Sequence, residues 1–199
     1  TTWYARYSTS GSSYTLTAKN TKSTINSATN WTLSSDKTTA TRTIAYGGSI
    51  TLPTVAAYDK TGYTISFLGW FTSPEGGQQY TNSSVYYIRG DFTLYARYSE
   101  TNILYTLTAD AQGGTIPATT SWTVASDGKT ATKGSLIYNM AVGTLPEPTR
   151  TGYTFAGWFT TATGGTQVTT AYAMPANSIT IYAHWTANPV TFDSDWKTQ

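Results

Sequence analysis

The clearest pattern in the chain is a strict alternation of apolar and polar positions, and it occurs three times. It appears at residues 2–7, 93–98 and 180–185, which read TWYARY, TLYARY and TIYAHW. Side chains alternate between the two faces of a β-strand, so each segment predicts a strand with one apolar face directed into a core. The apolar faces are Trp3, Ala5 and Tyr7; Leu94, Ala96 and Tyr98; and Ile181, Ala183 and Trp185. The opposite faces carry Tyr with Arg or His, which is typical of a solvated face.

Shorter strand patterns fill most of the remaining chain. YTLTA begins at Tyr14 and again at Tyr105, and each copy alternates over a few residues. Each copy precedes a predicted hairpin, with its turn at residues 35–37 in the first case and at Asp127-Gly128 in the second, a dipeptide typical of hairpins. No segment shows a convincing helical stripe. The pattern therefore predicts a mostly β fold.

The segments recur in the same order, which predicts tandem modules. Tyr14 and Tyr105 begin matching segments at an offset of 91 residues, and TGYTISFLGWFT at residue 61 matches TGYTFAGWFT at residue 151. We expect residues 11–100 to form repeat 1 and residues 101–187 to form repeat 2. Residues 1–10 match the last strand of a preceding repeat. Residues 188–199 match nothing, and we interpret them as a tail or as the start of another domain.

Composition narrows the range of functions. Charged residues make up 11% of the chain, and the 12 Lys and Arg residues are scattered, so no nucleic-acid surface is predicted. The chain has no cysteine, and no apolar run reaches the roughly 20 residues of a membrane span. Aromatic residues make up 15% of the chain, which supplies the large side chains that a small core needs.

The candidate site residues are aromatic. Trp31 and Trp122 recur in the hairpins and are interpreted either as core residues or as ligand-facing aromatics that stack on sugars. Trp70 and Trp158 recur beside a glycine and are expected in the core. His184, the only histidine, occupies a position where Arg97 stands in the other copy, which favours a solvated face over a metal or catalytic role. We predict no catalytic residue, metal site or cofactor.

The second module resembles the Listeria–Bacteroides repeat, also called the internalin B-repeat. The resemblance is carried by the segments LPxPxRTGYTFAGWF, GG and ITIYAHW, which contribute Leu145, Pro146, Pro148, Thr151, Gly152, Tyr153, Phe155, Gly157, Trp158, Gly164, Gly165, Tyr182, Ala183 and Trp185. The first module departs from it by an insertion before Trp70, by the loss of the second proline, and by Asn20-Thr21-Lys22 in place of Gln112-Gly113-Gly114. The resemblance implies β-grasp-like (ubiquitin- or SUMO-like) modules strung along a bacterial surface protein.

These observations predict a structural or adhesive repeat region of a secreted or cell-surface bacterial protein, and not an enzyme. Its partners would be another protein or a glycan at the cell surface. Two alternatives stay open. The modules could bind glycans through surface Trp and Tyr, or residues 1–8 could pair with the sheet edge of another copy and build a filament.

Overall fold

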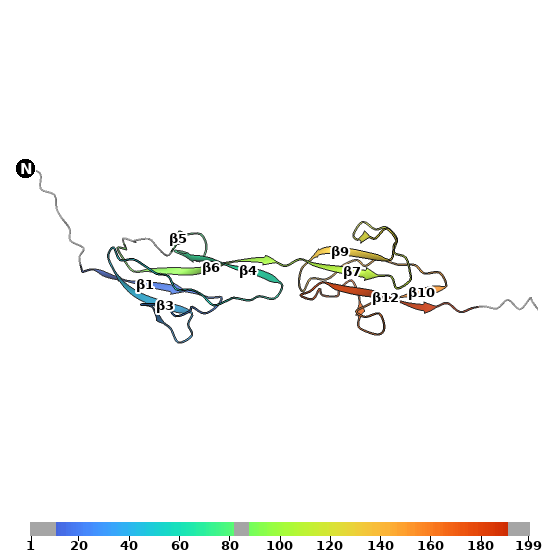
Figure 1. Cartoon of the computed structure of the whole chain (residues 1–199), viewed down its shortest axis with the longest axis horizontal. Coiled ribbons are helices and arrows are strands. Elements are labelled where there is room, and N and C mark those ends of the chain that lie inside the picture. The colour runs from blue at the N-terminus through green and yellow to red at the C-terminus, as the bar shows by residue number, and fades with distance from the viewer. Residues whose placement is uncertain (1–10, 82–87, 191–199) are drawn as a thin grey trace, which may run out of the picture. The chain divides into compact units, whose positions relative to one another are not determined.

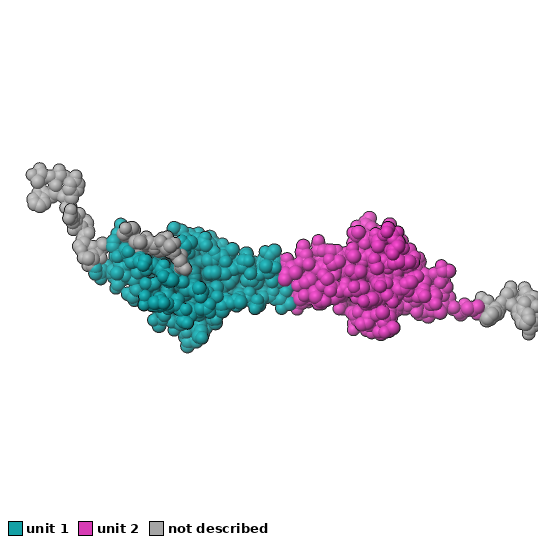
Figure 2. Space-filling view, in the orientation of Figure 1, with its two compact units in different colours: residues 1–101 teal, residues 102–199 magenta. Residues whose placement is uncertain are grey.

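The computed structural model describes residues 11–81 and 88–190. These residues form β-strands joined by turns and loops, and they contain no helix (Figure 1). The chain divides into two compact units, residues 1–101 and residues 102–199, called unit 1 and unit 2 below (Figure 2). The expected strand at residues 1–10, together with its self-association through residues 1–8, lies outside the described residues.

Each unit contains six strands among its described residues. In unit 1 these are β1 (Ser13–Lys19), β2 (Thr32–Leu33), β3 (Thr39–Ala45), β4 (Tyr63–Phe71), β5 (Gln79–Tyr80) and β6 (Phe92–Asn102). In unit 2 they are β7 (Tyr105–Asp110), β8 (Thr123–Val124), β9 (Thr130–Leu136), β10 (Tyr153–Phe159), β11 (Gln167–Val168) and β12 (Ile179–Ala187).

The two sheets have the same strand order. In unit 1 the order is β2-β3-β1-β6-β4-β5, and in unit 2 it is β8-β9-β7-β12-β10-β11. The predicted tandem organisation of two similar β-rich modules is therefore confirmed. The predicted hairpins are confirmed as well, since β2 pairs with β3 and β8 with β9 in antiparallel register.

At the centre of each sheet, the first and last long strands of the unit run parallel to one another (Figure 1). In unit 1, β1 pairs with β6 from Leu16↔Phe92 to Lys19↔Tyr95. In unit 2, β7 pairs with β12 from Leu107↔Ile179 to Asp110↔Tyr182. A parallel pair cannot be joined by a tight turn, so the intervening chain forms the rest of the unit.

The backbone conformation explains why a glycine precedes the tryptophan in both β4 and β10. Gly69 and Gly157 have φ of 122° and 127°, values that side-chain-bearing residues rarely adopt. At Gly157 the β10–β12 register shifts, as at a β-bulge. The Trp that follows each glycine is 2% exposed. The expected burial of Trp70 and Trp158 is thus confirmed.

The core of each unit consists of residues from that unit alone. The central pair supplies fully buried Leu16 and Leu94 in unit 1, and Leu107 and Ile181 in unit 2. Ala96 and Trp185 pack against these clusters as partly buried residues. The apolar faces predicted for the two described last strands therefore do face the cores.

Candidate functional site

The hairpin tryptophans lie in the cores, not on a surface. Trp31 is 8% exposed and Trp122 is 6% exposed. Each indole N–H donates to a main-chain carbonyl: Trp31 Nε1 to Thr51 O at 2.7 Å, and Trp122 Nε1 to Thr144 O at 3.0 Å. A ligand-facing role would need an exposed ring face. The burial corrects that interpretation of Trp31 and Trp122 in favour of the core alternative.

His184 lies on the solvated side of its strand, as its position predicts. Its ring stacks on Phe159 with centroids 4.0 Å apart, and Nε2 lies 2.9 Å from the Thr161 carbonyl oxygen, to which it can donate. Arg97 packs on the equivalent phenylalanine of unit 1, with its guanidinium 4.3 Å from the Phe71 ring centroid, and its Nη1 donates to Gly76 O in the turn that follows. The described residues contain no cluster of three potential metal ligands.

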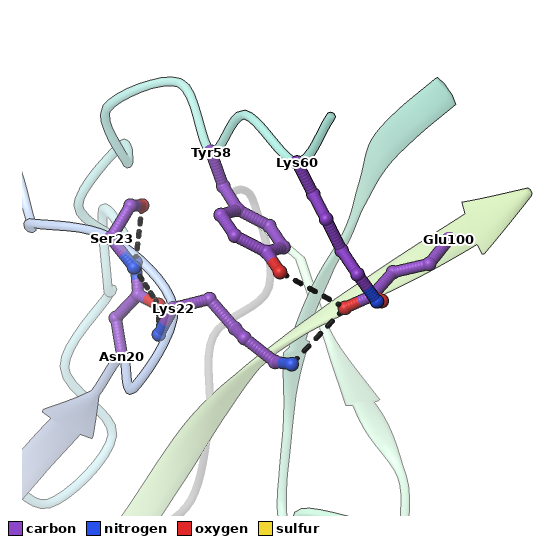
Figure 3. Close-up of polar contacts among 6 residues, drawn as sticks. All are labelled: Asn20, Lys22, Ser23, Tyr58, Lys60 and Glu100. Carbon is purple, nitrogen blue, oxygen red and sulfur yellow. Dashed lines mark hydrogen bonds and ion pairs between the residues drawn. The ribbon is translucent and has the colours of Figure 1, made fainter. Parts of the chain in front are cut away.

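Asn20, directly after β1, is the centre of a polar network in unit 1 that includes Ser23 and Tyr98; Asn20 and Ser23 are drawn in Figure 3. Asn20, which is 1% exposed, donates from Nδ2 to Ser23 Oγ at 3.0 Å and to Tyr98 Oη at 2.9 Å. Its Oδ1 accepts the backbone N–H groups of Lys22 and Ser23. All polar atoms of this buried amide have partners, as a stable buried polar group requires.

Beside this network, Glu100 lies between two lysines (Figure 3). Its carboxylate is 2.6 Å from Lys60 Nζ and 3.1 Å from Lys22 Nζ. Hydrogen bonds from Lys60 and then Lys22 lower the pKa of Glu100 to about 2. The same carboxylate raises the pKa of both lysines. The two lysine side chains are exposed and Glu100 is half-buried, so we assign the three residues a local electrostatic role with little effect on stability.

Unit 2 has a different arrangement at the equivalent place. Trp185 occupies the position of Tyr98, and its indole N–H donates to Ala111 O at 2.9 Å. Arg150 lies 3.9 Å from the Tyr153 ring centroid and donates from Nη1 to Gln112 O. Lys60 lies over Tyr63 in unit 1 at the same distance. The cation over tyrosine is therefore a feature of both units.

Each unit also has a shallow groove at the same position in its fold. Groove 1, of about 370 Å³, is walled by residues 95–98 of β6, by Lys19 and residues 21–22 after β1, and by Pro74 in the β4–β5 turn. Groove 2, of about 540 Å³, is walled by residues 183–185 of β12, by Gln112 and Arg150, and by residues 162–164. Both lie within the range of about 300–1,000 Å³ that small-molecule sites occupy.

The comparisons with known proteins explain the shared fold. Residues 31–97 and residues 105–184 each match the Listeria–Bacteroides repeat domain, and the two matches cover more than half of the chain. The chain belongs to the Listeria–Bacteroides repeat family. It is also similar to Internalin H of Listeria monocytogenes serovar 1/2a (strain ATCC BAA-679 / EGD-e), with 32% identity over 146 residues. That alignment covers 73% of this chain and 23% of Internalin H.

Membership in the Listeria–Bacteroides repeat family makes this chain a repeat region of a bacterial surface-protein type, not an enzyme. The two Listeria–Bacteroides repeats supply no catalytic residue to transfer. Among the described residues, no helix has the length and apolar character needed to cross a membrane.

Sequence reasoning missed the groove. The alternation in β6 placed Tyr95 and Arg97 on the solvated face, but it did not indicate that Lys19 lies beside Tyr95. That neighbour follows from the parallel register of β1 and β6, which joins residues 76 positions apart. The recurrence of aromatic and cationic residues in the last strand was the one available signal.

Proposed function

We propose that these modules act as spacers in an extracellular or cell-surface region of a bacterial protein, with repeat 1 at residues 11–100 and repeat 2 at residues 101–187. One observation carries the proposal: the first and last strands of each unit are adjacent and parallel. The chain consequently enters a unit at one end of its sheet and leaves at the other. Further units can then be added along the strand direction, which suits a spacer.

The same topology supports mechanical resistance. Tension between the ends of unit 2 pulls β7 and β12 in opposite directions along their shared ladder, so that the hydrogen bonds between them resist together. Side chains add to this contact in both units. In unit 2 the backbone N–H of Thr106 donates to Ser178 Oγ at 2.9 Å, and in unit 1 that of Thr15 donates to Asp91 Oδ1 at 2.7 Å. A spacer exposed to tension benefits from bonds that must break together.

We further propose that the module is a β-grasp variant. The first strand, β1, pairs antiparallel with β3 and parallel with the last strand, β6, and this pairing supports the relationship. The connection from β3 to β4, where a β-grasp fold carries its helix, contains no helix among the residues described here. The variant would cover the sheet with extended chain, including the bridge between Ile25 and Val55.

Single-molecule pulling tests the spacer role. The full chain, held by its two termini, should unfold in two separate events, each releasing roughly 300 Å of chain at about 3.3–3.6 Å per residue. As a control, cysteine handles at Asn102 and Ile137 would load β7 and β9 at their shared end and open their ladder one bond at a time. That geometry should unfold unit 2 at lower force. Equal forces in both geometries would contradict the proposal.

A further inference from the structure

We propose that groove 1 of unit 1 binds an acidic glycan through Lys19, Tyr95 and Arg97. The inference goes beyond the proposed spacer function, which is tested separately by pulling, so either can fail without the other. Trp31 and Trp122 play no part in the site.

The three side chains share one face of the central pair. Ala18 and its ladder partner Leu94 are fully buried, so Lys19 and its partner Tyr95 face the opposite side. Arg97 follows Tyr95 by two residues and lies on the same face. A tyrosine flanked by two cations offers a stacking surface for a sugar ring and donors for its carboxylate.

The cations of this face have no acidic partner within the described chain. The ion pairs found there join Glu100 to Lys22 and to Lys60. The charges of Lys19 and Arg97 are therefore available to a ligand. Arg97 is also held in place, because its guanidinium lies over Phe71 and donates to Gly76 O. A guanidinium has five N–H donors, so others remain for a carboxylate.

Unit 2 provides a natural contrast. Asp110 and Tyr182 are the ladder partners at the place of Lys19 and Tyr95, and His184 replaces Arg97. The equivalent face thus carries an acid in place of a lysine and a histidine in place of an arginine. Groove 2 still has the cation Arg150, whereas Lys19, Lys22 and Arg97 line groove 1, so an anionic ligand should prefer groove 1.

The choice of a glycan over an acidic peptide follows from the shape and lining of the groove. Groove 1 has a volume of about 370 Å³, and its lining combines Tyr95 and Tyr98 with the cations Lys19, Lys22 and Arg97. An acidic peptide that bound by strand addition would need a free sheet edge. Residues 95–98 lie in β6, which is at the centre of the sheet between β1 and β4.

The test titrates the full chain with a tetramer of galacturonic acid. Binding is monitored through the backbone amide NMR resonances of the chain. The methyl-esterified tetramer is the neutral control of the same shape, and tetra-aspartate is the peptide control. We expect the acidic tetramer to shift the amides of Lys19, Tyr95 and Arg97 and to leave those of Asp110, Tyr182 and His184 in place. Binding should weaken as salt rises, because exposed charges are screened.

Three variants sharpen the test. Arg97→Gln should weaken binding about tenfold, the effect of losing one charge-assisted hydrogen-bond pair. The Lys19 side chain is exposed, so Lys19→Gln should leave the fold intact. By the same reasoning this variant should weaken binding several-fold. Lys37→Gln, in the β2–β3 turn, removes the same net charge elsewhere and should leave affinity unchanged.

Four results would overturn the proposal. They are unmoved groove 1 resonances, equal binding of the ester, an equal loss of affinity in Lys37→Gln, and tighter binding of tetra-aspartate. The last of these would indicate a protein partner at this face.

Discussion

Units 1 and 2 share a backbone fold but have different side chains at one end of their central strand pairs, β1–β6 and β7–β12. Unit 2 places Trp185 over the chain, and a Cβ at Gly114 would clash with its indole ring. Unit 1 has the smaller Tyr98 there and Ser23 at the place of Gly114, and the two hydroxyls lie 3.1 Å apart. Buried Asn20 likewise stands where unit 2 has the fully buried Ala111.

This difference shows that the family tolerates linked exchanges at this place. A large indole requires glycine beneath it and bonds directly to a main-chain carbonyl. A phenol leaves room for a hydroxyl and an amide, which must then satisfy one another. The two units therefore serve as controls for each other, and each change below is paired with its counterpart.

The largest expected effect is the loss of a Gly-Trp tryptophan. Trp70→Ala and Trp158→Ala should each lower the free energy of unfolding of their own unit by about 3–5 kcal/mol. The indole is 2% exposed in both cases and donates to Pro53 O or Pro146 O. Denaturant melts measure the loss, and a change below about 1 kcal/mol would indicate a surface residue.

A smaller loss is expected at the polar network of unit 1. Asn20→Ala leaves Tyr98 Oη and Ser23 Oγ without the amide that donates to them, which should cost about 1–3 kcal/mol. Adding Tyr98→Trp and Ser23→Gly transfers the unit 2 arrangement and should recover part of that loss. If the triple variant is less stable than Asn20→Ala alone, the two arrangements are not interchangeable.

The hairpin turns should respond in opposite directions. Lys37 and Gly128 occupy equivalent positions with φ of 56° and 67°. Lys37→Gly relieves an unfavourable conformation and should stabilise unit 1 by up to about 1 kcal/mol. Gly128→Ala should destabilise unit 2 by about 1 kcal/mol or more, since the new Cβ would also meet Thr115 Cγ2 at 2.8 Å. Thermal melts of both variants test this pair, and a shift in the same direction would contradict it.

The smallest effect concerns pH. The folded-state pKa of Glu100 is about 2, below its ordinary value of 4.5. Its contribution to stability is therefore present above about pH 4.5 and is lost as the pH falls toward 2. Glu100→Gln should remove this dependence from unit 1 alone, because Ala187 stands at the equivalent position in unit 2. The stability gap between the full chain and the Glu100→Gln variant should be smaller at pH 3 than at pH 7, and a constant gap would exclude the mechanism.

The sequence predicted the elements well where local pattern decides them. Alternation identified the faces of β6 and β12, and turn residues located the β2–β3 and β8–β9 hairpins. Repetition identified Trp70 and Trp158 as core residues. Each of these inferences depends on neighbours within a few positions or on comparison of one copy with another.

The rest depends on contacts between distant residues. The parallel register of β1 with β6 has no local signature, so the neighbours Lys19 and Tyr95 could not be predicted. The same holds for Trp31 and Trp122, whose burial depends on the chain that leads from β3 to β4. Asn20 was noticed only as the start of the segment that replaces Gln112-Gly113-Gly114, although its side chain is the centre of a buried network.

The central claim is that the chain contains two copies of one fold, each with a core built from its own residues. Amide hydrogen exchange of the full chain carrying Trp158→Ala tests it most directly. Exchange at Leu107 and Ala109 in β7 should accelerate by about two to four orders of magnitude, as expected for a loss of about 3–5 kcal/mol. Exchange at Leu16 and Ala18 in β1 should stay as it is in the unchanged protein. Equal acceleration in β1 and β7 would mean that the two units share one cooperative core, which would contradict the account.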